Sequence, residues 1–352
     1  MNYYGFGIIG LGLIADFHAR AINEMAGGKL VACLSRDKNK AINFAEKYKC
    51  YPYHSLEEFL LHQDLDIVTI CTPSGAHLEP AVKAAEAGKH IIVEKPLEIS
   101  LQRCDKIIKT CEENRVKLAG IFQSRFSPLC QIIKNAIEEE RFGRLVLCDA
   151  YVKWQRSQDY YDNCIWHGTL SLDGGGALIN QSIHAIDLLS YFVGDVAELF
   201  AYIDTIGHCR IDVEDNAVVV LKFKRGALGV VEGSTSVYPG FLKRLEISGT
   251  EGSVIIEEDI LKVWDFKVKK KEDDSIVKKF MFQENISGGG ASDPANISYL
   301  GHKKQFEDMV ESIEHNHSSL VDGLEARKAV EIVLAAYQSA REKKPIHLPL
   351  SY

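Results

Sequence analysis

The chain has 352 residues, of which 46% are hydrophobic and 26% are charged. This length exceeds what one ordinary hydrophobic core occupies, so it predicts two domains. The formal net charge is -8, which argues against a general affinity for nucleic acid or acidic lipid. No apolar run approaches the ~20 residues that a membrane-spanning helix needs, so we expect neither nucleic acid nor a membrane as a partner.

The cysteines indicate the compartment. There are nine of them, with no C-x-x-C pair and no spacing typical of metal ligands. This pattern favours reduced thiols in the cytoplasm, and it predicts no metal site. The N-terminus lacks the basic flank of a signal peptide. The one dense basic run, KVKKKEDD at residues 267–274, leads directly into acids and predicts a solvated hairpin tip.

The first elements form a dinucleotide-binding motif. The segment YGFGIIGLGLIADFHARAI, residues 4–22, predicts a short strand over 6–9, a turn at Gly10 and Gly12, and a helix that begins at Leu13 and Ile14. The glycines and the alanine that follows give the G-x-G-x-x-A fingerprint between a strand and a helix. The amides of the helix N-terminus suit a pyrophosphate, so these four residues are predicted to bind the cofactor.

The following segments repeat this alternation. Predicted strands are KLVACLS (29–35), DIVTICTP (66–73), HIIVEKP (90–96) and VKLAGIF (116–122), and predicted helices cover 38–48, 77–88 and 101–114. Strands and helices that alternate at this spacing predict an α/β fold with a doubly wound parallel sheet. We expect a Rossmann domain over residues 1–123, with ligands at the C-terminal ends of its strands.

The end of the second predicted strand bears on the choice of cofactor. NAD-specific proteins usually place an acid there for the ribose 2′-hydroxyl. This chain has Ser35 and Arg36, and a hydroxyl beside a guanidinium suits a 2′-phosphate. The sequence thus predicts NAD or NADP with a preference for NADP, and Asp37 would favour NAD instead.

Two further strand ends carry candidates for the cofactor site. The first offers Thr72, Pro73 and His77, although the proline also suits the end of a strand and the histidine the start of a helix. The second carries Glu94 and Lys95, followed by proline. A lysine held between an acid and a proline at this edge of the sheet is predicted to face a ligand, and the alternative is a solvated surface lysine.

These motifs identify a resemblance. The segments GIIGLGLIADFHARAI, CTPSGAH, VEKPL, FQSRFSP and DGGGALINQSIHAIDLLSYFVG resemble the glucose–fructose oxidoreductase, inositol dehydrogenase and MocA family, in order and at similar spacing. The resemblance implies a Rossmann domain followed by an α/β domain with an open, mostly antiparallel sheet, whose outer face commonly makes oligomer contacts. It also adds Gln123 to the predicted cofactor site.

The second half of the chain fits a separate α/β domain over residues 124–352. Alternating runs between residues 197 and 266, broken at Arg225-Gly226 and Glu251-Gly252, predict a meander of antiparallel strands. Residues 285–298 are rich in glycine and small polar side chains, and we expect a substrate flap there. Two supporting helices are predicted over 301–314 and 324–343.

The chemistry is assigned by the resemblance. Oxidation of a secondary alcohol needs a base for the hydroxyl proton and a donor or cation for the developing alkoxide. The family's two catalytic residues correspond here to Lys95 and His184, and the ordinary pKa of histidine suits proton transfer at neutral pH. The alternative for His184 is a core histidine.

The helix that carries His184 also holds Asn180 and Asp187, at spacings that put all three on one face. Polyol dehydrogenases of the family usually have aspartate where this chain has Asn180. An amide orients an imidazole or a sugar hydroxyl but cannot complete a charged relay. We therefore expect Asn180 to position substrate or His184, and Asp187 to be structural.

Asn180 and the segments around it resemble the corresponding segments of UDP-N-acetylglucosaminuronate 3-dehydrogenases. Such a substrate calls for cations and aromatic rings, and the predicted contacts are Arg125, Lys153, Trp154, Arg156, Tyr160 and Tyr161, together with Lys95, Asn180 and His184. One residue departs from this pattern, because His167 occupies a position where arginine is expected.

The sequence therefore predicts an NAD(P)-dependent sugar dehydrogenase or ketosugar reductase, acting at C3 of a UDP-linked N-acetylated sugar. One alternative is a free aldose, inositol or polyol dehydrogenase. Another is a non-enzymatic regulator that senses a dinucleotide, since fold does not fix function, but a regulator is expected to lack the lysine or the histidine. The sequence also predicts a homodimer or homotetramer formed through the C-terminal sheet.

Overall fold

The computed structural model describes residues 3–281 and 298–351. It divides into two compact units, of which the first contains 1–123, 171–174 and 298–330, and the second contains 124–170, 175–297 and 331–352. Two segments of the predicted range 124–352, residues 171–174 and 298–330, pack with the first unit. The suspected flap at 285–298 lies, apart from Ser298, outside the described residues.

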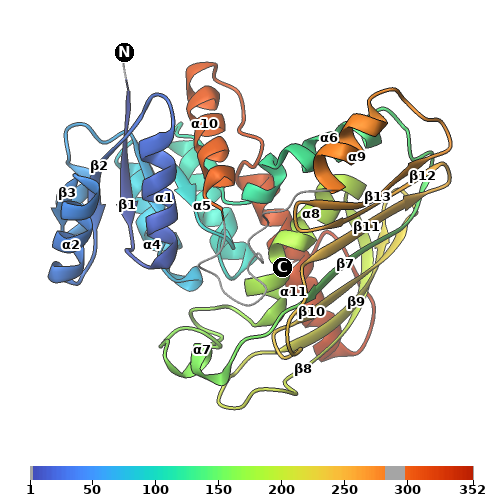
Figure 1. Ribbon diagram of the computed structural model, residues 1–352. Coiled ribbons are helices and arrows are strands. Elements are labelled where there is room, and N and C mark those ends of the chain that lie inside the picture. Colours follow the sequence, from blue (N-terminus) through green and yellow to red (C-terminus); the bar gives the residue numbers. More distant parts are fainter. Residues whose placement is uncertain (1–2, 282–297, 352) are drawn as a thin grey trace. The chain divides into compact units, whose positions relative to one another are not determined.

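The first unit contains a six-stranded sheet in which all neighbouring strands are parallel. Its strands are β1 (Tyr4–Ile9), β2 (Gly28–Leu34), β3 (Tyr51–Tyr53), β4 (Ile67–Ile70), β5 (His90–Val93) and β6 (Leu118–Gly120), in the order β3-β2-β1-β4-β5-β6. This is the strand order of a dinucleotide-binding fold, so the predicted Rossmann domain is confirmed (Figure 1). The sequence did not predict β3, a three-residue edge strand with a central proline.

The helices of the first unit explain why residues 298–330 belong to it. They are α1 (Leu13–Glu24), α2 (Lys38–Tyr48), α3 (Leu56–Leu60), α4 (Leu78–Glu86), α5 (Leu101–Glu113) and α10 (Leu300–Glu314). Helix α10 lies beside α1 (Figure 1). Its Phe306 and Met309 are fully buried in one hydrophobic core with Phe6 of β1 and Ile22 of α1. The Rossmann core is therefore completed by a helix from far along the chain.

The segment at residues 171–174 joins the first unit through local packing. The amide of Gly75 donates a hydrogen bond to the carbonyl oxygen of Leu172 at 2.8 Å. Gly174 approaches Ile99 so closely that an added Cβ would lie 2.4 Å from a side-chain carbon of that residue. Contacts of this kind cannot be anticipated from sequence spacing.

The second unit contains an eight-stranded sheet. Its strands are β7 (Leu145–Lys153), β8 (Val196–Asp204), β9 (Asn216–Phe223), β10 (Leu228–Ser234), β11 (Arg244–Gly249), β12 (Gly252–Glu257), β13 (Ile260–Phe266) and β14 (Ile346–His347), in the order β13-β12-β11-β7-β10-β9-β8-β14. All neighbours are antiparallel except β7 and β10. The mostly antiparallel sheet is confirmed, but the predicted simple meander is wrong because β7 lies between its two halves.

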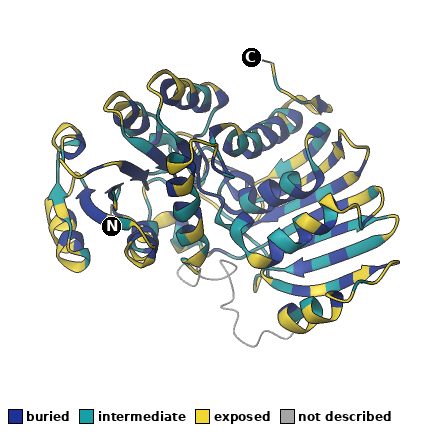
Figure 2. Cartoon of the chain, turned by 90° about the horizontal axis from the view of Figure 1, so that it is seen from above, coloured by how far each residue is buried: buried dark blue, intermediate teal, exposed yellow. Residues whose placement is uncertain are grey.

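One face of this sheet is buried and the other is open. Along β9, residues alternate strictly between buried and exposed after the first position, as expected when one face meets a core, and Figure 2 shows this banding across the strands. The helices of the unit are α6 (Pro128–Glu138), α7 (Gln158–Asp162), α8 (Ile183–Val193), α9 (Asp273–Met281) and the part of α11 (Gly323–Glu342) from residue 331. No helix in the described part of the chain is long and apolar enough to cross a membrane.

The basic run at 267–274 is not the predicted hairpin tip. It leads from β13 into α9, whose first residue is Asp273. The carboxylate of Asp273 is buried, accepts a hydrogen bond from the Trp264 indole at 2.7 Å, and pairs with Arg141 at 2.8 Å. The acid that follows the lysines therefore anchors a helix, which the charge pattern alone did not indicate.

Candidate active site

The C-terminal edge of the parallel sheet gathers most of the residues predicted to bind the cofactor. Gly10 follows β1, with φ of +87°, and an added Cβ would lie 2.8 Å from the Thr72 amide nitrogen. Neither the backbone angle nor the space suits another residue. The fingerprint glycine thus lets the ends of β1 and β4 approach each other.

Two features of the first unit fit a bound dinucleotide. Among the described residues no side chain caps the N-terminus of α1, and an added Cβ at the N-cap, Gly12, would meet nothing within 4 Å. Leu13 is 55% exposed, so unpaired amides and open backbone remain for a diphosphate. The side-chain oxygen of Gln123 is buried with no hydrogen-bond partner among residues 3–281 and 298–351, which leaves an acceptor for a ligand amide or hydroxyl.

The end of β2 has exposed polar groups at the predicted ribose site. Ser35 accepts a hydrogen bond from the Asp37 amide at 3.2 Å, and Arg36 is exposed. The carboxylate of Asp37 caps α2 by accepting the Lys40 amide at 3.1 Å. The acid that would favour NAD therefore serves the helix in this structure, while Arg36 extends into solvent.

At the end of β4, Thr72 and Pro73 lead into a short 3-10 turn (Ser74–Ala76). The imidazole of His77 is 1% exposed, and its nitrogens lie 3.0 Å from the carbonyl oxygens of Pro96 and Thr72. Burial lowers the pKa of His77. The ring ties the loops after β4 and β5 together, so the predicted cofactor contact of His77 gains no support from its geometry.

Glu94 is the centre of a buried cluster with His18 and His302. Its Oε1 lies 2.8 Å from His18 Nε2 and 3.7 Å from His302 Nε2, while Oε2 accepts the Lys95 amide at 3.0 Å. Burial opposes ionisation of Glu94, but the two histidines hold its pKa well below its usual range. Glu94 therefore fixes the backbone of Lys95, and its predicted contact with the cofactor is indirect at most.

The spacing of His18 and Glu94 in this trio does not suit two ligands of one metal ion. Two ligand atoms about 2.0 Å from a tetrahedral ion stand about 3.3 Å apart. The 2.8 Å separation of His18 Nε2 and Glu94 Oε1 is instead that of a hydrogen bond, and Nδ1 of His18 lies 2.8 Å from the Thr69 hydroxyl. This geometry suits a shared proton.

In the second unit, the helix with Asn180 and His184 starts irregularly. Residues Ala177–Ser182 form a π-helical turn that continues into α8. Asn180 and His184 are both partly exposed, whereas Asp187 is 1% exposed. π-Helical turns often occur at functional sites. On this polar face Asn180 and His184 are therefore accessible, whereas Asp187 is buried.

The buried part of that face is structural, as predicted for Asp187. Its carboxylate forms a bidentate pair with Arg125, with 2.9 Å to Nε and 2.6 Å to Nη2, and both side chains are almost completely buried. The guanidinium also lies 4.6 Å from the ring centre of Tyr191. Because Arg125 is committed to these partners, its predicted substrate contact is not supported by the structure.

A residue that the sequence reasoning missed holds the start of the same helix. Glu214, just before β9, accepts the amides of Gly176 at 2.9 Å and Leu178 at 2.8 Å, and the hydroxyl of Tyr337 at 2.9 Å. Burial raises its pKa to about 7 although these hydrogen bonds lower it. The sequence offers only an acidic pair ahead of a strand, and this signal does not identify the partners.

The other predicted substrate residues lie in the second unit, and some of them form an aromatic group. The guanidinium of Arg156 stacks over Trp154 and Tyr160, with 5.2 and 5.5 Å to the ring centres. Tyr160 in turn stacks on His167 at 4.2 Å. Lys153 stands apart and pairs with Glu232 at 2.6 Å, and the Tyr161 hydroxyl lies 2.9 Å from that of Thr235. The structure thus groups Trp154, Arg156, Tyr160 and His167.

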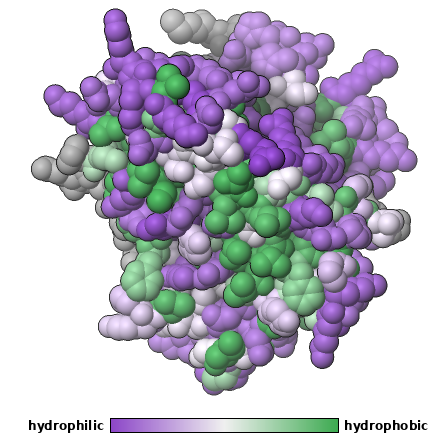
Figure 3. Space-filling model, turned by 90° about the vertical axis from the view of Figure 1, so that its right-hand side faces the viewer, coloured by the Kyte–Doolittle hydropathy of each residue, from purple (hydrophilic) through white to green (hydrophobic). Residues whose placement is uncertain are grey.

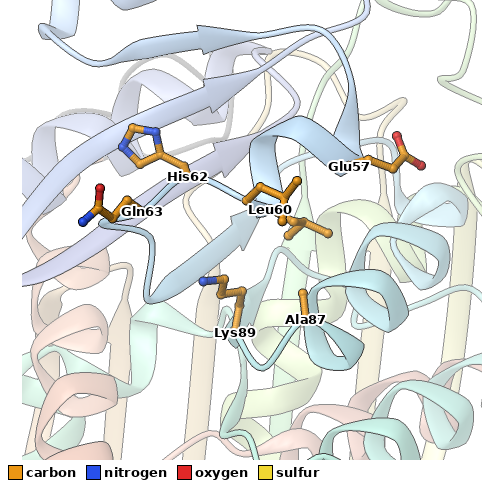
Figure 4. Close-up of a pocket in the computed structure, with 7 residues that line it drawn as sticks. Glu57, Leu60, His62, Gln63, Ala87 and Lys89 are labelled. Carbon is orange, nitrogen blue, oxygen red and sulfur yellow. The ribbon is translucent and has the colours of Figure 1, made fainter.

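A surface hollow in the first unit lies at the N-terminal ends of strands of the parallel sheet. Its lining includes Leu60, His62 and Gln63 ahead of β4, and Ala87 and Lys89 ahead of β5 (Figure 4). Ligands of such sheets bind beyond the C-terminal ends of the strands. The hollow is therefore not a candidate for the active site.

The fold and the strand-end residues define a class, the oxidoreductases that bind a nicotinamide dinucleotide on a Rossmann sheet. Residues 4–122 match the oxidoreductase family with an NAD-binding Rossmann fold, and residues 130–255 match the GFO/IDH/MocA C-terminal domain. The chain belongs to this GFO/IDH/MocA family of NAD-dependent oxidoreductases, so the predicted family and enzyme class are confirmed.

The chain is similar to three known proteins over much or all of its length. The WlbA dehydrogenase from Bordetella pertussis, solved with NADH and UDP-GlcNAcA, is 29% identical and has a TM-score of 0.90, with 99% of each chain covered. The scyllo-inositol 2-dehydrogenase (NAD(+)) of Bacillus subtilis is 32% identical, covering 71% of this chain and 72% of its own. The myo-inositol 2-dehydrogenase of Thermotoga maritima is 27% identical over 97% and 98% of the two chains.

Proposed function

We propose that the protein transfers hydride between a nicotinamide cofactor and a secondary alcohol of a sugar, at C3 of a UDP-linked N-acetylated sugar. The observation that carries this proposal is the similarity to a dehydrogenase solved with UDP-GlcNAcA, at 29% identity over 99% of both chains. It is supported by Asn180, which departs from the aspartate of polyol dehydrogenases, and by the aromatic group around Arg156.

In this proposal Lys95 and His184 serve one substrate, and their pairing rests on the family resemblance. His184 takes the hydroxyl proton, because imidazole is the side chain suited to proton transfer near neutral pH. Lys95 stabilises the developing alkoxide with its charge, and Glu94 holds its backbone. Asn180 orients the substrate or the imidazole. The bound nicotinamide supplies only the hydride acceptor or donor.

The cofactor is NAD or NADP, held at Gly10, Gly12, Leu13, Ile14 and Gln123. We propose a preference for NADP, because Arg36 is exposed and the Asp37 carboxylate caps α2. Titration of the protein with NADH and NADPH, followed by cofactor fluorescence, tests this choice. Tighter binding of NADH would reverse it.

We propose that the open face of the second sheet joins copies of this chain into a dimer or tetramer. Exposed apolar residues cover neighbouring strands, namely Leu147, Tyr202, Val218, Val220 and Leu228. Tyr202 lies opposite Val218, and Leu147 lies opposite Leu228. Figure 3 shows an apolar area on one face of the molecule, bordered by hydrophilic side chains. Exposed patches of this kind mark interfaces, and sedimentation as a monomer would contradict the proposal.

We also propose that the protein works in the cytoplasm, where thiols stay reduced. All nine cysteines, which lie within the described residues, are free. An oxidising compartment would instead favour paired cysteines. Cell fractionation with an antibody against the protein tests this location, and recovery from an oxidising compartment would overturn it.

The second candidate substrate is a free inositol or polyol, favoured by the similarity to the two inositol 2-dehydrogenases. A thermal-shift and turnover panel of UDP-sugars against free inositols and aldoses, with both cofactors, separates the candidates. We expect a response to UDP-N-acetylated sugars. Turnover confined to free polyols would replace our first proposal with the second.

The catalytic assignment is tested by two substitutions. Lys95→Met and His184→Ala are each expected to lower kcat by ~100-fold or more, because each removes a group that acts in the transition state. Cofactor binding by His184→Ala should stay within about twofold, and Glu331→Gln, outside the proposed site, serves as the control for both. Near-normal turnover in both variants would overturn the assignment. Cofactor binding without turnover of any substrate would support the regulator.

A further inference from the structure

The first turn of the helix with Asn180 and His184 has no cap of its own. Its N-cap residue is Gly176, which has no side chain to offer. Glu214 from the adjoining part of the second unit takes that place, because its Oε2 accepts the Gly176 amide and its Oε1 accepts the Leu178 amide. The backbone oxygen of Glu214 accepts the intervening Ala177 amide at 3.0 Å. Three successive amides at the helix N-terminus thus converge on one residue.

The site is closely packed on both sides. An added Cβ at Gly176 would lie 1.7 Å from the backbone oxygen of Glu214, and one at Gly175 would lie 2.1 Å from the hydroxyl of Tyr337. That hydroxyl donates to Glu214 Oε1 at 2.9 Å. Gly175 and Gly176 therefore allow the backbone of the turn to pack directly against Glu214 and Tyr337.

We propose that Glu214 is a positioning residue, which with Tyr337 clamps the glycine turn and so fixes where Asn180 and His184 stand. The clamp rests on the proposed function only for its catalytic consequence. A displacement of about 1 Å in a reacting group can reduce turnover strongly. Asn180 lies within the turn, with its amide bonded to the Gly176 carbonyl oxygen at 3.0 Å, and His184 follows four residues later.

The clamp depends on the charge of Glu214. An ionised carboxylate accepts all three donors, whereas a protonated one carries an O–H that competes with them. Burial outweighs these hydrogen bonds and raises the pKa of Glu214 to about 7, above its value in an opened, solvated turn, so the free energy of opening the clamp falls as the pH rises through that value. Burial beside Glu214 raises the pKa of the Tyr337 phenol well above its ordinary value, and it remains a donor.

The neighbouring ionisable groups do not compete for these contacts. Asp215, the next residue, accepts the amides of Ile206, Gly207 and His208 together with the ring of His208. Residues 177–183 carry no ionisable side chain, so His184 is the first on this helix. Tyr337 is the ionisable side chain that hydrogen-bonds the Glu214 carboxylate.

The test uses Glu214→Gln, which keeps the size and shape of the side chain. It replaces one carboxylate oxygen, a hydrogen-bond acceptor, with an NH2 group that faces another donor. Glu331→Gln is the matched control, because its carboxylate is also buried and accepts a backbone amide, that of Leu350 at 3.0 Å. Hydrogen exchange of the peptide that spans 176–184, measured by mass spectrometry at pH 8, should be at least ~10-fold faster in Glu214→Gln than in the wild type or the control. Tyr337→Phe should give a smaller increase, because it removes one neutral donor.

Turnover provides the second readout. In Glu214→Gln we expect kcat to fall by about 10-fold or more while the NADH dissociation constant changes by less than about twofold. The fall in exchange protection of the wild type between pH 6 and pH 8, corrected for intrinsic rates, should be absent from this variant, which has no carboxyl group to titrate at position 214. Unchanged exchange would overturn the clamp, and faster exchange with unchanged kcat would overturn its positioning role. If the wild type oxidises no sugar, the proposed function fails, while the exchange data still decide the clamp.

Discussion

Replacing Asp187 with asparagine tests whether the buried pair beneath the candidate catalytic helix is structural. Arg125 is 2% exposed and Asp187 is 1% exposed, so Asp187→Asn leaves a guanidinium buried without its counter-charge. Breaking such a pair destabilises by about 3–5 kcal/mol. The control is Asp195→Asn, whose pair with Lys224 is about half exposed at both side chains and contributes about 0–1 kcal/mol.

The assay exploits the distribution of tryptophan. All three tryptophans, Trp154, Trp166 and Trp264, lie in the second unit with both ion pairs. Urea unfolding followed by tryptophan fluorescence therefore reports the unit that contains the perturbation. The double variant Arg125→Met/Asp187→Leu removes both charges and should recover to within about 2 kcal/mol of the wild type.

Two results would refute this reasoning. If Asp187→Asn lowers the free energy of unfolding no more than Asp195→Asn, the buried pair does not stabilise the second unit as argued. If the double variant is stable but its KM for the sugar rises at least ~10-fold, Arg125 contacts the substrate as the sequence first suggested.

The remaining predictions concern Asp273 and Asn180. Burial raises the pKa of Asp273, but hydrogen bonds from Arg141, the Lys270 amide and Trp264 outweigh it and bring the pKa to about 2. Because the folded value lies below the unfolded one, Asp273→Asn should lower the free energy of unfolding by about 2 kcal/mol above pH 4, and by progressively less as the pH falls towards 2; a loss independent of pH would contradict the ion pair. Asn180→Asp should raise the pKa of His184 and shift the acid limb of kcat/KM upward by about 0.5–1 pH unit, and an unchanged pH profile would mean that Asn180 does not act on His184.

The first unit could be predicted from sequence because its signals are local. The G-x-G-x-x-A turn, the strand–helix alternation and the residues that follow each strand lie close together along the chain, and parallel sheets place those ends at one edge. The short edge strand β3 escaped prediction because a three-residue run containing proline has no periodicity to detect.

The candidate site was less predictable because its polar residues are sorted by packing. Arg125, His77 and Glu94 are chemically plausible ligand contacts, yet they are buried and engaged by Asp187, by backbone carbonyl oxygens and by His18, respectively. Charge and position in a motif cannot distinguish such residues from accessible ones. Asn180 and His184 share a helix face with Asp187, but only the first two are partly exposed.

Residue types and short spacings were enough to predict the parallel sheet with its cofactor-binding turn, and the resemblance of the motifs to a known family supplied Lys95 and His184 as candidate catalytic residues. Tertiary packing was needed to show that α10 completes the Rossmann core, that β7 divides the second sheet, and that Glu214 caps the candidate catalytic helix. Each of these depends on contacts between segments far apart in the chain. Such contacts are selected by the burial of apolar surface and the need to satisfy backbone amides, and neither leaves a local pattern in the sequence.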